Sequence, residues 1–177
     1  MDTIMTSIPN VEGLAAEDTG VRLKEDPMST PRVVADIMTR EIEVLHEEDN
    51  LKHISQRMDR LKLRHLPVVD GTRLVGLISH HDMLRLAVSE LLLFAPVART
   101  RERYLEENTF VAKVMTRNPV TVTPQTPIAE AAELLFGARV GCLPVVEDGQ
   151  LVGIVTETDF LGLLVQLLKT DHGASVA

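Results

Sequence analysis

The chain has little of what disulfide-bonded, secreted or membrane-spanning proteins require. Its single cysteine, Cys142, has no second cysteine to pair with, so no internal disulfide can form. The longest apolar run, residues 91–98, is far shorter than the ~20 residues of a spanning helix. The first residues do not combine a basic stretch with an apolar core, as a secretory signal does. We therefore expect a cytoplasmic protein that makes no contact with membranes.

An excess of basic residues is also missing. The chain has 18 Lys and Arg against 26 Asp and Glu, a net charge of −8. Non-specific nucleic-acid binding depends on neutralising phosphates with basic side chains, so we do not expect nucleic acid as a partner. The first half of the chain nevertheless contains a cluster of basic residues: Arg57, Arg60, Lys62, Arg64, His65 and Arg73. This cluster could bind a small anion, or it could consist of ordinary solvated charges.

Recognisable catalytic and metal-binding motifs are absent from the sequence. It shows no nucleophile–base pair, no phosphate-cradling glycine-rich loop and no set of metal ligands at a standard spacing. His80 and His81 are adjacent at a predicted strand-to-helix turn, where their side chains point in different directions. We therefore expect neither an enzyme nor a metal site in the protein itself. Magnesium is more plausible as an ion carried by a bound polyphosphate.

What the chain does contain is a repeat. Residues 34–91 align with residues 111–168 without a gap, at an offset of 77 and with 17 identities in 58 positions. Each copy ends in the same pattern, Gly, two aliphatic residues, Ser or Thr, any two residues and Asp, at 76–82 and 153–159. Two copies of one supersecondary unit usually pack around a pseudo-twofold axis. The clefts between them are then the natural functional site.

Apolar periodicity and turn residues predict an α/β (α+β) fold of two β-α-β-β-α repeats. We expect a flexible leader over 1–30, repeats over 31–95 and 109–170, a linker over 96–108 and a flexible tail over 171–177. Each repeat alone, at about 60 residues, would be marginally stable, so the two need one another. The expected elements are a helix over 32–38 capped by Thr30, strands near 43–45, 65–69, 73–78, 120–122, 142–146 and 151–155, helices from 51, 82, 128 and 159, and hairpin turns at 70–71 and 148–149.

Two copies of Met-Thr-Arg, of aliphatic-Pro-Val-Val and of the Gly-to-Asp pattern, all at one offset, resemble a tandem pair of CBS domains, or Bateman module. The resemblance implies that an adenine nucleotide of the AMP, ADP or ATP class binds in the clefts between the copies. It also implies a non-catalytic regulatory role with no obligatory cofactor. Family members are commonly attached to the protein that they regulate. Here we expect a stand-alone module that signals to a separate, unknown effector protein.

In the family, the segment after Met-Thr lines the adenine pocket with backbone groups and aliphatic side chains. Each matching residue could equally belong to an ordinary helix-to-strand connection. The resemblance implies ligand contacts at Thr39, Ile42 and Val44 in the first copy and at Thr116, Pro119 and Thr121 in the second.

The polar residues of the repeated pattern supply the second part of the expected site. A carboxylate can accept hydrogen bonds from both hydroxyls of a ribose diol, which suits Asp82 and Asp159. Ser79 or Thr156 can donate to a phosphate beside a helix N-terminus, whose free N–H groups also favour anions. The alternative is that each Asp only caps its helix.

The two residues before Leu-Pro distinguish the copies. Arg64 and His65 in the first copy are basic, as in family members that bind phosphates tightly, whereas Gly141 and Cys142 in the second are not. Arg64 offers a planar fork of donors, and His65 adds charge below about pH 6.5. We therefore expect two unequal sites, one of them weak or empty. The alternative is a surface Arg-His pair without a ligand, and we expect Cys142 to be a small buried hydrophobic residue.

The predicted helices after Asp82 and Asp159 are apolar on more than one face. The sister repeat or a second chain must cover the additional apolar surface, and we expect a homodimer. The sequence as a whole predicts a nucleotide-sensing regulatory module. The alternative is a structural dimerisation module with empty or vestigial pockets.

Overall fold

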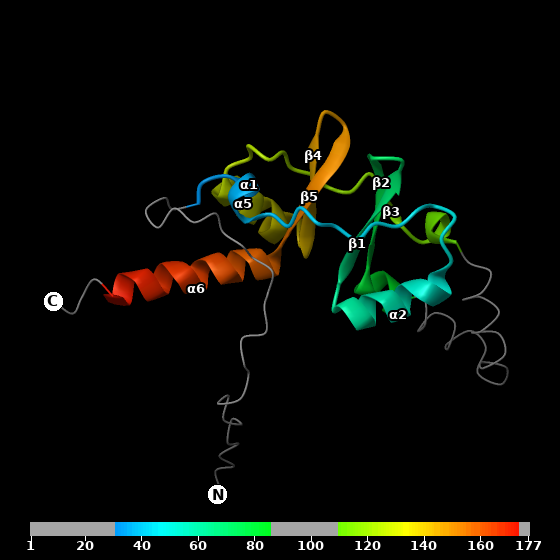
Figure 1. Ribbon diagram of the computed structural model, residues 1–177, viewed down its shortest axis with the longest axis horizontal. Helices are drawn as coiled ribbons and strands as arrows, with labels where there is room; N and C mark the ends of the chain where they lie inside the picture. Colours follow the sequence, from blue (N-terminus) through cyan, green and yellow to red (C-terminus); the bar gives the residue numbers. More distant parts are fainter. Residues whose placement is uncertain (1–30, 86–109, 174–177) are drawn as a thin grey trace, which may run out of the picture.

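The computed structural model describes residues 31–85 and 110–173, and its elements follow the repeat (Figure 1). The predicted fold class is confirmed. The leader, the linker, the Thr30 cap and the part of the helix after Asp82 that lies beyond residue 85 are outside the described residues. The elements are α1 (Val34–Ile37), α2 (Leu51–Leu61), β1 (His65–Asp70), β2 (Arg73–Ser79), a helix over 80–85, η1 (Val111–Lys113), β3 (Thr116–Arg117), α5 (Ile128–Ala138), β4 (Cys142–Glu147), β5 (Gln150–Thr156) and α6 (Glu157–Gly173).

Each repeat contains one antiparallel hairpin, and the two hairpins join into one sheet. β1 pairs with β2 and β4 pairs with β5, each with an irregularity inside its Val-Val pair. The pairing of Arg73 with Gln150 connects the hairpins in the order β1-β2-β5-β4. The second hairpin turns at Asp148 and Gly149 as predicted, both at positive φ. The first turns at residues 71–72, one position later than predicted.

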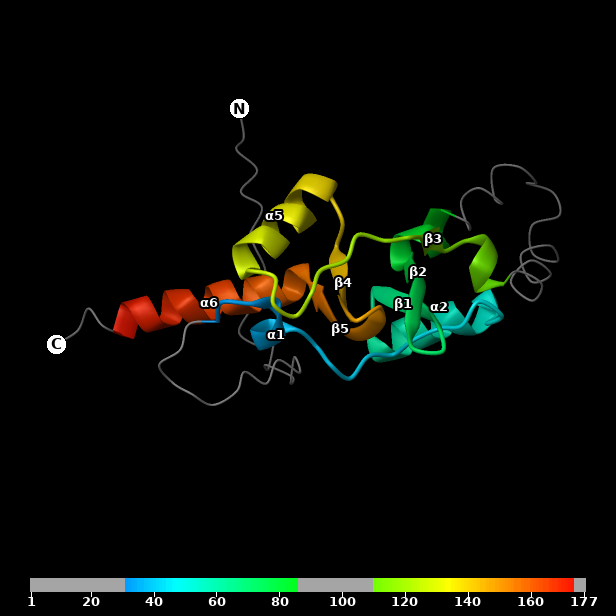
Figure 2. The ribbon, with the colours of Figure 1, turned by 90° about the horizontal axis from the view of Figure 1, so that it is seen from above.

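The segment that leads into each repeat packs on the other repeat. Figure 1 shows α1 on the side of α5 and α6, while η1 lies beside α2, and Figure 2 shows the same exchange from above. Val34, Ile37 and Met38 are buried in the core of the second repeat. Val111 and Met115 are buried in the core of the first. The two repeats therefore complete each other's cores.

Backbone pairing accompanies this exchange. Thr39 and Ile154 exchange hydrogen bonds of 2.9 and 3.0 Å, which ties the first leading segment to β5. In the same way, β3 pairs with β2. The close approach depends on glycine, since a Cβ on Gly153 would lie 2.7 Å from Met38 Sδ and 3.2 Å from the carbonyl oxygen of Thr39.

Several predicted boundaries are wrong, most of them near these crossings. The helix predicted over 32–38 comprises only Val34–Ile37, because Asp36 Oδ2 accepts hydrogen bonds from the N–H groups of Arg32 and Val33 just before it. The strands predicted at 43–45 and 120–122 are reduced to single parallel bridges, since both segments are crossing from one repeat to the other. The short strand β3 was not expected from the sequence. Finally, α6 extends to Gly173, three residues into the predicted flexible tail.

Candidate functional site

The repeated Ser/Thr-x-x-Asp pattern forms a helix cap in both repeats. Asp82 Oδ2 accepts hydrogen bonds from the N–H (2.9 Å) and hydroxyl (2.6 Å) of Ser79. The N–H of Asp82 donates back to Ser79 Oγ at 3.2 Å, which completes a capping box. Asp159 Oδ2 accepts the equivalent bonds from Thr156, at 2.7 and 2.8 Å. The prediction that Asp opens each helix is therefore wrong, because Ser79 and Thr156 are the caps and each Asp is the third helical residue.

The two carboxylates differ in their surroundings. Asp159 is only 6 % exposed, whereas Asp82 is half-buried. Burial raises the pKa of Asp159, and the hydrogen bonds from Thr156 partly oppose this effect. The cap holds each carboxylate in a fixed position at the end of a strand, next to the first free N–H groups of a helix. Such a turn can offer a neighbouring ligand both a hydrogen-bond acceptor and hydrogen-bond donors.

The segments expected to line the adenine pocket connect the two repeats. Residues 39–45 begin beside β5 at Ile154 and end beside β1 at Val68. Residues 116–122 begin beside β2 and end beside β4. The structure therefore places Thr39 beside the strand that ends at Thr156, and Thr116 beside the strand that ends at Ser79. Along these segments, three side chains are half-buried and three are exposed. The half-buried ones are Ile42, Val44 and Pro119, and the exposed ones are Thr39, Thr116 and Thr121.

His65 also reaches from the first repeat to the second. Its imidazole lies so close to Gly141 that a Cβ on this glycine would be 2.8 Å from Cε1 and 2.9 Å from Nε2. Burial lowers the pKa of His65; the charge of Glu157 opposes this effect, Arg64 adds to it and Asp82 opposes it. His65 therefore lies in a half-buried position where charges from both repeats act on it.

Backbone carbonyls at two corresponding positions, Arg64 and Gly141, bind the first residue of the helix that follows each hairpin. The carbonyl of Arg64 accepts a hydrogen bond from the N–H of His80 at 2.8 Å. The carbonyl of Gly141 accepts one from the N–H of Glu157 at 3.2 Å. The Arg64 side chain is exposed. Glu157 was not among the site residues predicted from the sequence, although the alignment of the repeats places this acid at the position of His80.

Other residues singled out from the sequence have structural roles. Cys142 is buried as predicted, and burial, with the charge of Glu157, raises its pKa to about 12. The duplicated Arg40 and Arg117 donate hydrogen bonds to the carbonyls of Ala35 and Ala112, five residues earlier. Arg57 of the basic cluster forms an ion pair with Glu43. These contacts favour the ordinary interpretation of the three arginines.

Within residues 31–85 and 110–173, no three His, Cys, Asp or Glu side chains form a group that could hold a metal ion. In that same part of the chain, no helix is both long and apolar enough to cross a membrane.

Comparison with known proteins identifies both repeats. The family model described as "CBS domain" matches residues 34–89 and 111–166. A CBS domain-containing protein of Dictyostelium discoideum is 33 % identical over 141 residues, covering 77 % of this chain and 94 % of its own length. Protein MJ1225 of Methanocaldococcus jannaschii is 30 % identical over 149 residues, which cover 84 % of this chain but only 52 % of that relative.

A solved structure connects this fold with a ligand. The crystal structure of CBSX2 of Arabidopsis thaliana in complex with AMP has a TM-score of 0.63 and 28 % identity to this chain. It covers 77 % of this chain and 98 % of its own. The fold and the repeat are thus shared with a protein that was crystallised with AMP.

Proposed function

Because the chain belongs to the CBS domain family, we propose that it is a non-catalytic regulatory module that binds an adenine nucleotide between its two repeats. Binding changes the relative placement of the repeats and thereby the engagement of a separate effector protein. A ligand shifts such an equilibrium only by its difference in affinity for the two states. The cross-repeat segments offer that difference, since a ligand that contacts them touches both repeats at once.

One observation carries this proposal: each Ser/Thr-x-x-Asp turn follows a strand to which the other repeat contributes the neighbouring segment. At the start of α6, Thr156 and Asp159 come from the second repeat, whereas Thr39 and His65 come from the first. In the proposed complex, Asp159 accepts hydrogen bonds from the ribose, and Thr156, Arg64 and His65 contact phosphate. The AMP complex of CBSX2 supports this choice of ligand class.

We assign the turn at Ser79 and Asp82 to a second, weaker site. The segment beside this turn contains Thr116, Pro119 and Thr121. Gly141 and Cys142 occupy the positions that correspond to Arg64 and His65. Neither of these two residues has a cationic side chain that could bind a phosphate. We expect any magnesium to arrive with a bound polyphosphate.

A thermal-shift panel with AMP, ADP and ATP, each with and without magnesium, tests the proposed function. A ligand that binds only the folded state raises its stability by about 2.7 kcal/mol at a hundredfold excess over Kd. We expect at least one nucleotide to raise the Tm of the wild type, and Asp159→Asn to remove most of this shift. Asp70→Asn is the matched control, because Asp70 is exposed at the opposite end of β1 from His65. A ligand-free wild type that responds to none of the nucleotides would refute the sensor.

The exposed apolar face of α6 supports a homodimer, and it also supports the second candidate function, a dimerisation module with empty pockets. Leu161, Leu164 and Leu168 are 61, 50 and 52 % exposed and recur at helical spacing. We expect light scattering over a dilution series to show a dimer. The double substitution Leu161→Glu with Leu168→Glu should give a monomer, while Val120→Glu, at an exposed apolar position outside the helices, should not.

A wild type that is monomeric throughout the dilution series would contradict the homodimer. If the wild type dimerises but no nucleotide stabilises it, the dimerisation module becomes the better description. The cytoplasmic location remains a prediction from the sequence.

A further inference from the structure

Corresponding positions in the two repeats differ in their basic and acidic residues. At an offset of 77, three basic side chains of the first repeat correspond to two uncharged residues and one acid in the second. The residues are Arg64, His65 and His80 in the first repeat, and Gly141, Cys142 and Glu157 in the second. Of these six residues, His65, Gly141 and Glu157 lie close together across the boundary between the repeats.

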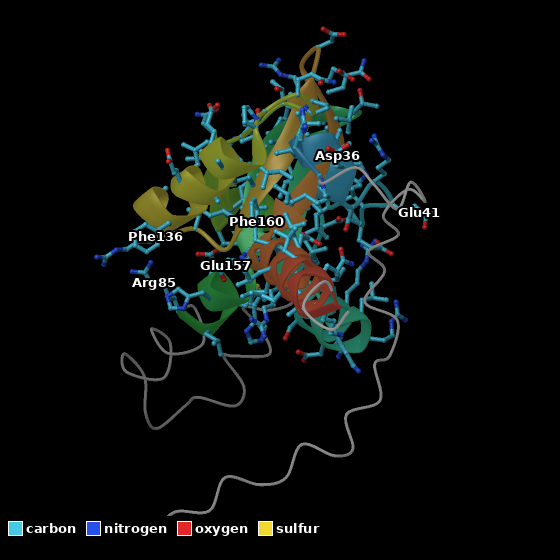
Figure 3. The ribbon with its side chains drawn as sticks, turned by 90° about the vertical axis from the view of Figure 1, so that its left-hand side faces the viewer. Asp36, Glu41, Arg85, Phe136, Glu157 and Phe160 are labelled. Carbon is cyan, nitrogen blue, oxygen red and sulfur yellow. The ribbon has the colours of Figure 1, made fainter. Side chains whose placement is uncertain are left out.

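Contacts around Gly141 bring these three residues together. The His65 ring occupies the space that a side chain at position 141 would need. Glu157 borders the same space, since its Oε2 would lie 3.8 Å from a Cβ on Gly141 and its N–H donates to the Gly141 carbonyl. Figure 3 shows Glu157 at the start of α6, on the side of the molecule that also carries Arg85 and Phe136. Glu157 is thus one residue from Thr156 and close to the imidazole of the opposite repeat.

The charge of Glu157 reaches the groups around it. It raises the pKa of both His65 and Cys142, although burial is the larger cause of the pKa shift in each case. Asp82 acts on His65 in the same direction as Glu157, and Arg64 acts in the opposite direction. A phosphate placed between His65 and the start of α6 would therefore meet the negative charges of Glu157 and Asp82 as well as the positive charge of Arg64.

We propose that Glu157 is a specificity-determining residue of the site at the start of α6, where it disfavours each additional negative charge on the ligand. The site accordingly takes adenosine ligands with no phosphate or one phosphate in preference to the triphosphate. This inference rests on the proposed function and adds to it the class of adenosine ligand. Arg64 supplies one positive charge for a phosphate and His65 a hydrogen-bonding ring nitrogen, whereas Glu157 opposes each further phosphate.

Calorimetric titration of the full chain with adenosine, AMP, ADP and ATP, without magnesium and at low ionic strength, tests this proposal. In Glu157→Gln we expect the ratio of Kd for ATP to Kd for AMP to fall by about five- to tenfold, and Kd for adenosine to change by less than about twofold. Glu157→Lys should lower the ratio further. Because the Glu157 side chain is exposed, raising the salt concentration should weaken the effect.

Glu147→Gln is the matched control. It removes the same charge from an exposed position in the same repeat, at the hairpin end of β4 and away from Cys142. We expect this variant to keep the wild-type ratio. An independent readout is the NMR titration of His65 without ligand, in which Glu157→Gln should lower the pKa of His65 and Glu147→Gln should leave it in place.

Two results would overturn the inference while leaving the proposed function intact. One is an unchanged ATP-to-AMP ratio in Glu157→Gln, and the other is an equal gain of affinity for adenosine and for ATP. Absence of binding of all four ligands to the wild type would instead overturn the proposed function, and this inference with it.

Discussion

At the scale of single residues, Asp159 combines burial with a place in the proposed site. Burial raises its pKa above the ordinary value of 3.8, so the folded state binds this proton more tightly than the unfolded state. The resulting stabilisation is present below pH 3.8 and is lost as the pH rises through the raised pKa. Asp159→Asn should remove the cost of burying a charge and keep an oxygen that can accept hydrogen bonds from Thr156. We therefore expect the wild type to gain stability relative to this variant as the pH falls from 7 towards 3.8, as measured by urea unfolding.

The opposite trend, in which the variant gains on the wild type as the pH falls, would contradict this prediction. It would mean that the hydrogen bonds from Thr156 outweigh the burial of Asp159. The pH dependence of unfolding does not test the ribose contact of Asp159. That contact is tested by nucleotide binding, which is measured near neutral pH.

At the scale of elements, the leading segments depend on glycines in β2 and β5. Gly153→Ala places a Cβ 2.7 Å from Met38 Sδ and 3.2 Å from the Thr39 carbonyl oxygen. Since the segment is held by two hydrogen bonds to Ile154, we expect it to yield only partly and the free energy of unfolding to fall by about 1–3 kcal/mol. Urea denaturation measures this change. The matched substitution Gly162→Ala, within α6, meets open space and should stabilise the protein by about 0.5–1 kcal/mol.

The combination of Gly153→Ala with Met38→Ala isolates the contact. The double variant should lose less stability than the sum of the two single variants, because removing the Met38 side chain makes room for the new Cβ. Additive losses, or a Gly153→Ala variant as stable as Gly162→Ala, would show that the crossing segment is not held tightly on β5.

At the scale of the whole molecule, the exchange makes the repeats interdependent. In the intact protein, Val111 and Met115 are buried in the core of the first repeat, and a fragment of residues 1–95 lacks them. A fragment of residues 96–177 lacks Val34 and Met38, which are buried in the core of the second repeat. We expect neither fragment to unfold cooperatively alone, because each is a marginal size and its core is incomplete. Mixing the two in equal amounts should restore a cooperative transition, as monitored by circular dichroism.

A cooperative transition in either isolated fragment would contradict this expectation. It would show that a repeat can complete its core with its own leading segment. The intact chain, measured at the same concentration, supplies the reference transition.

Local features of this protein were determined by its sequence. The hairpin at Asp148 and Gly149, the start of α5 at Ile128 and the Ser/Thr-x-x-Asp caps depend on hydrogen bonds and side-chain periodicity within a few residues. The duplication itself predicted two similar units that pack on each other. Such short-range signals are contained in the order of the residues, so they were predictable, apart from shifts of up to three positions at element ends.

Only the tertiary structure decided which repeat each leading segment completes. Val34 and Met38 are repeated as Val111 and Met115, so a segment that packs on its own repeat and one that packs on the sister repeat satisfy the same apolar pattern. The tertiary structure also decided the approach of His65 to Gly141 and Glu157, because this approach joins positions more than 70 residues apart. The sequence determined the parts and their duplication, whereas packing between two nearly equivalent halves determined how the site is shared.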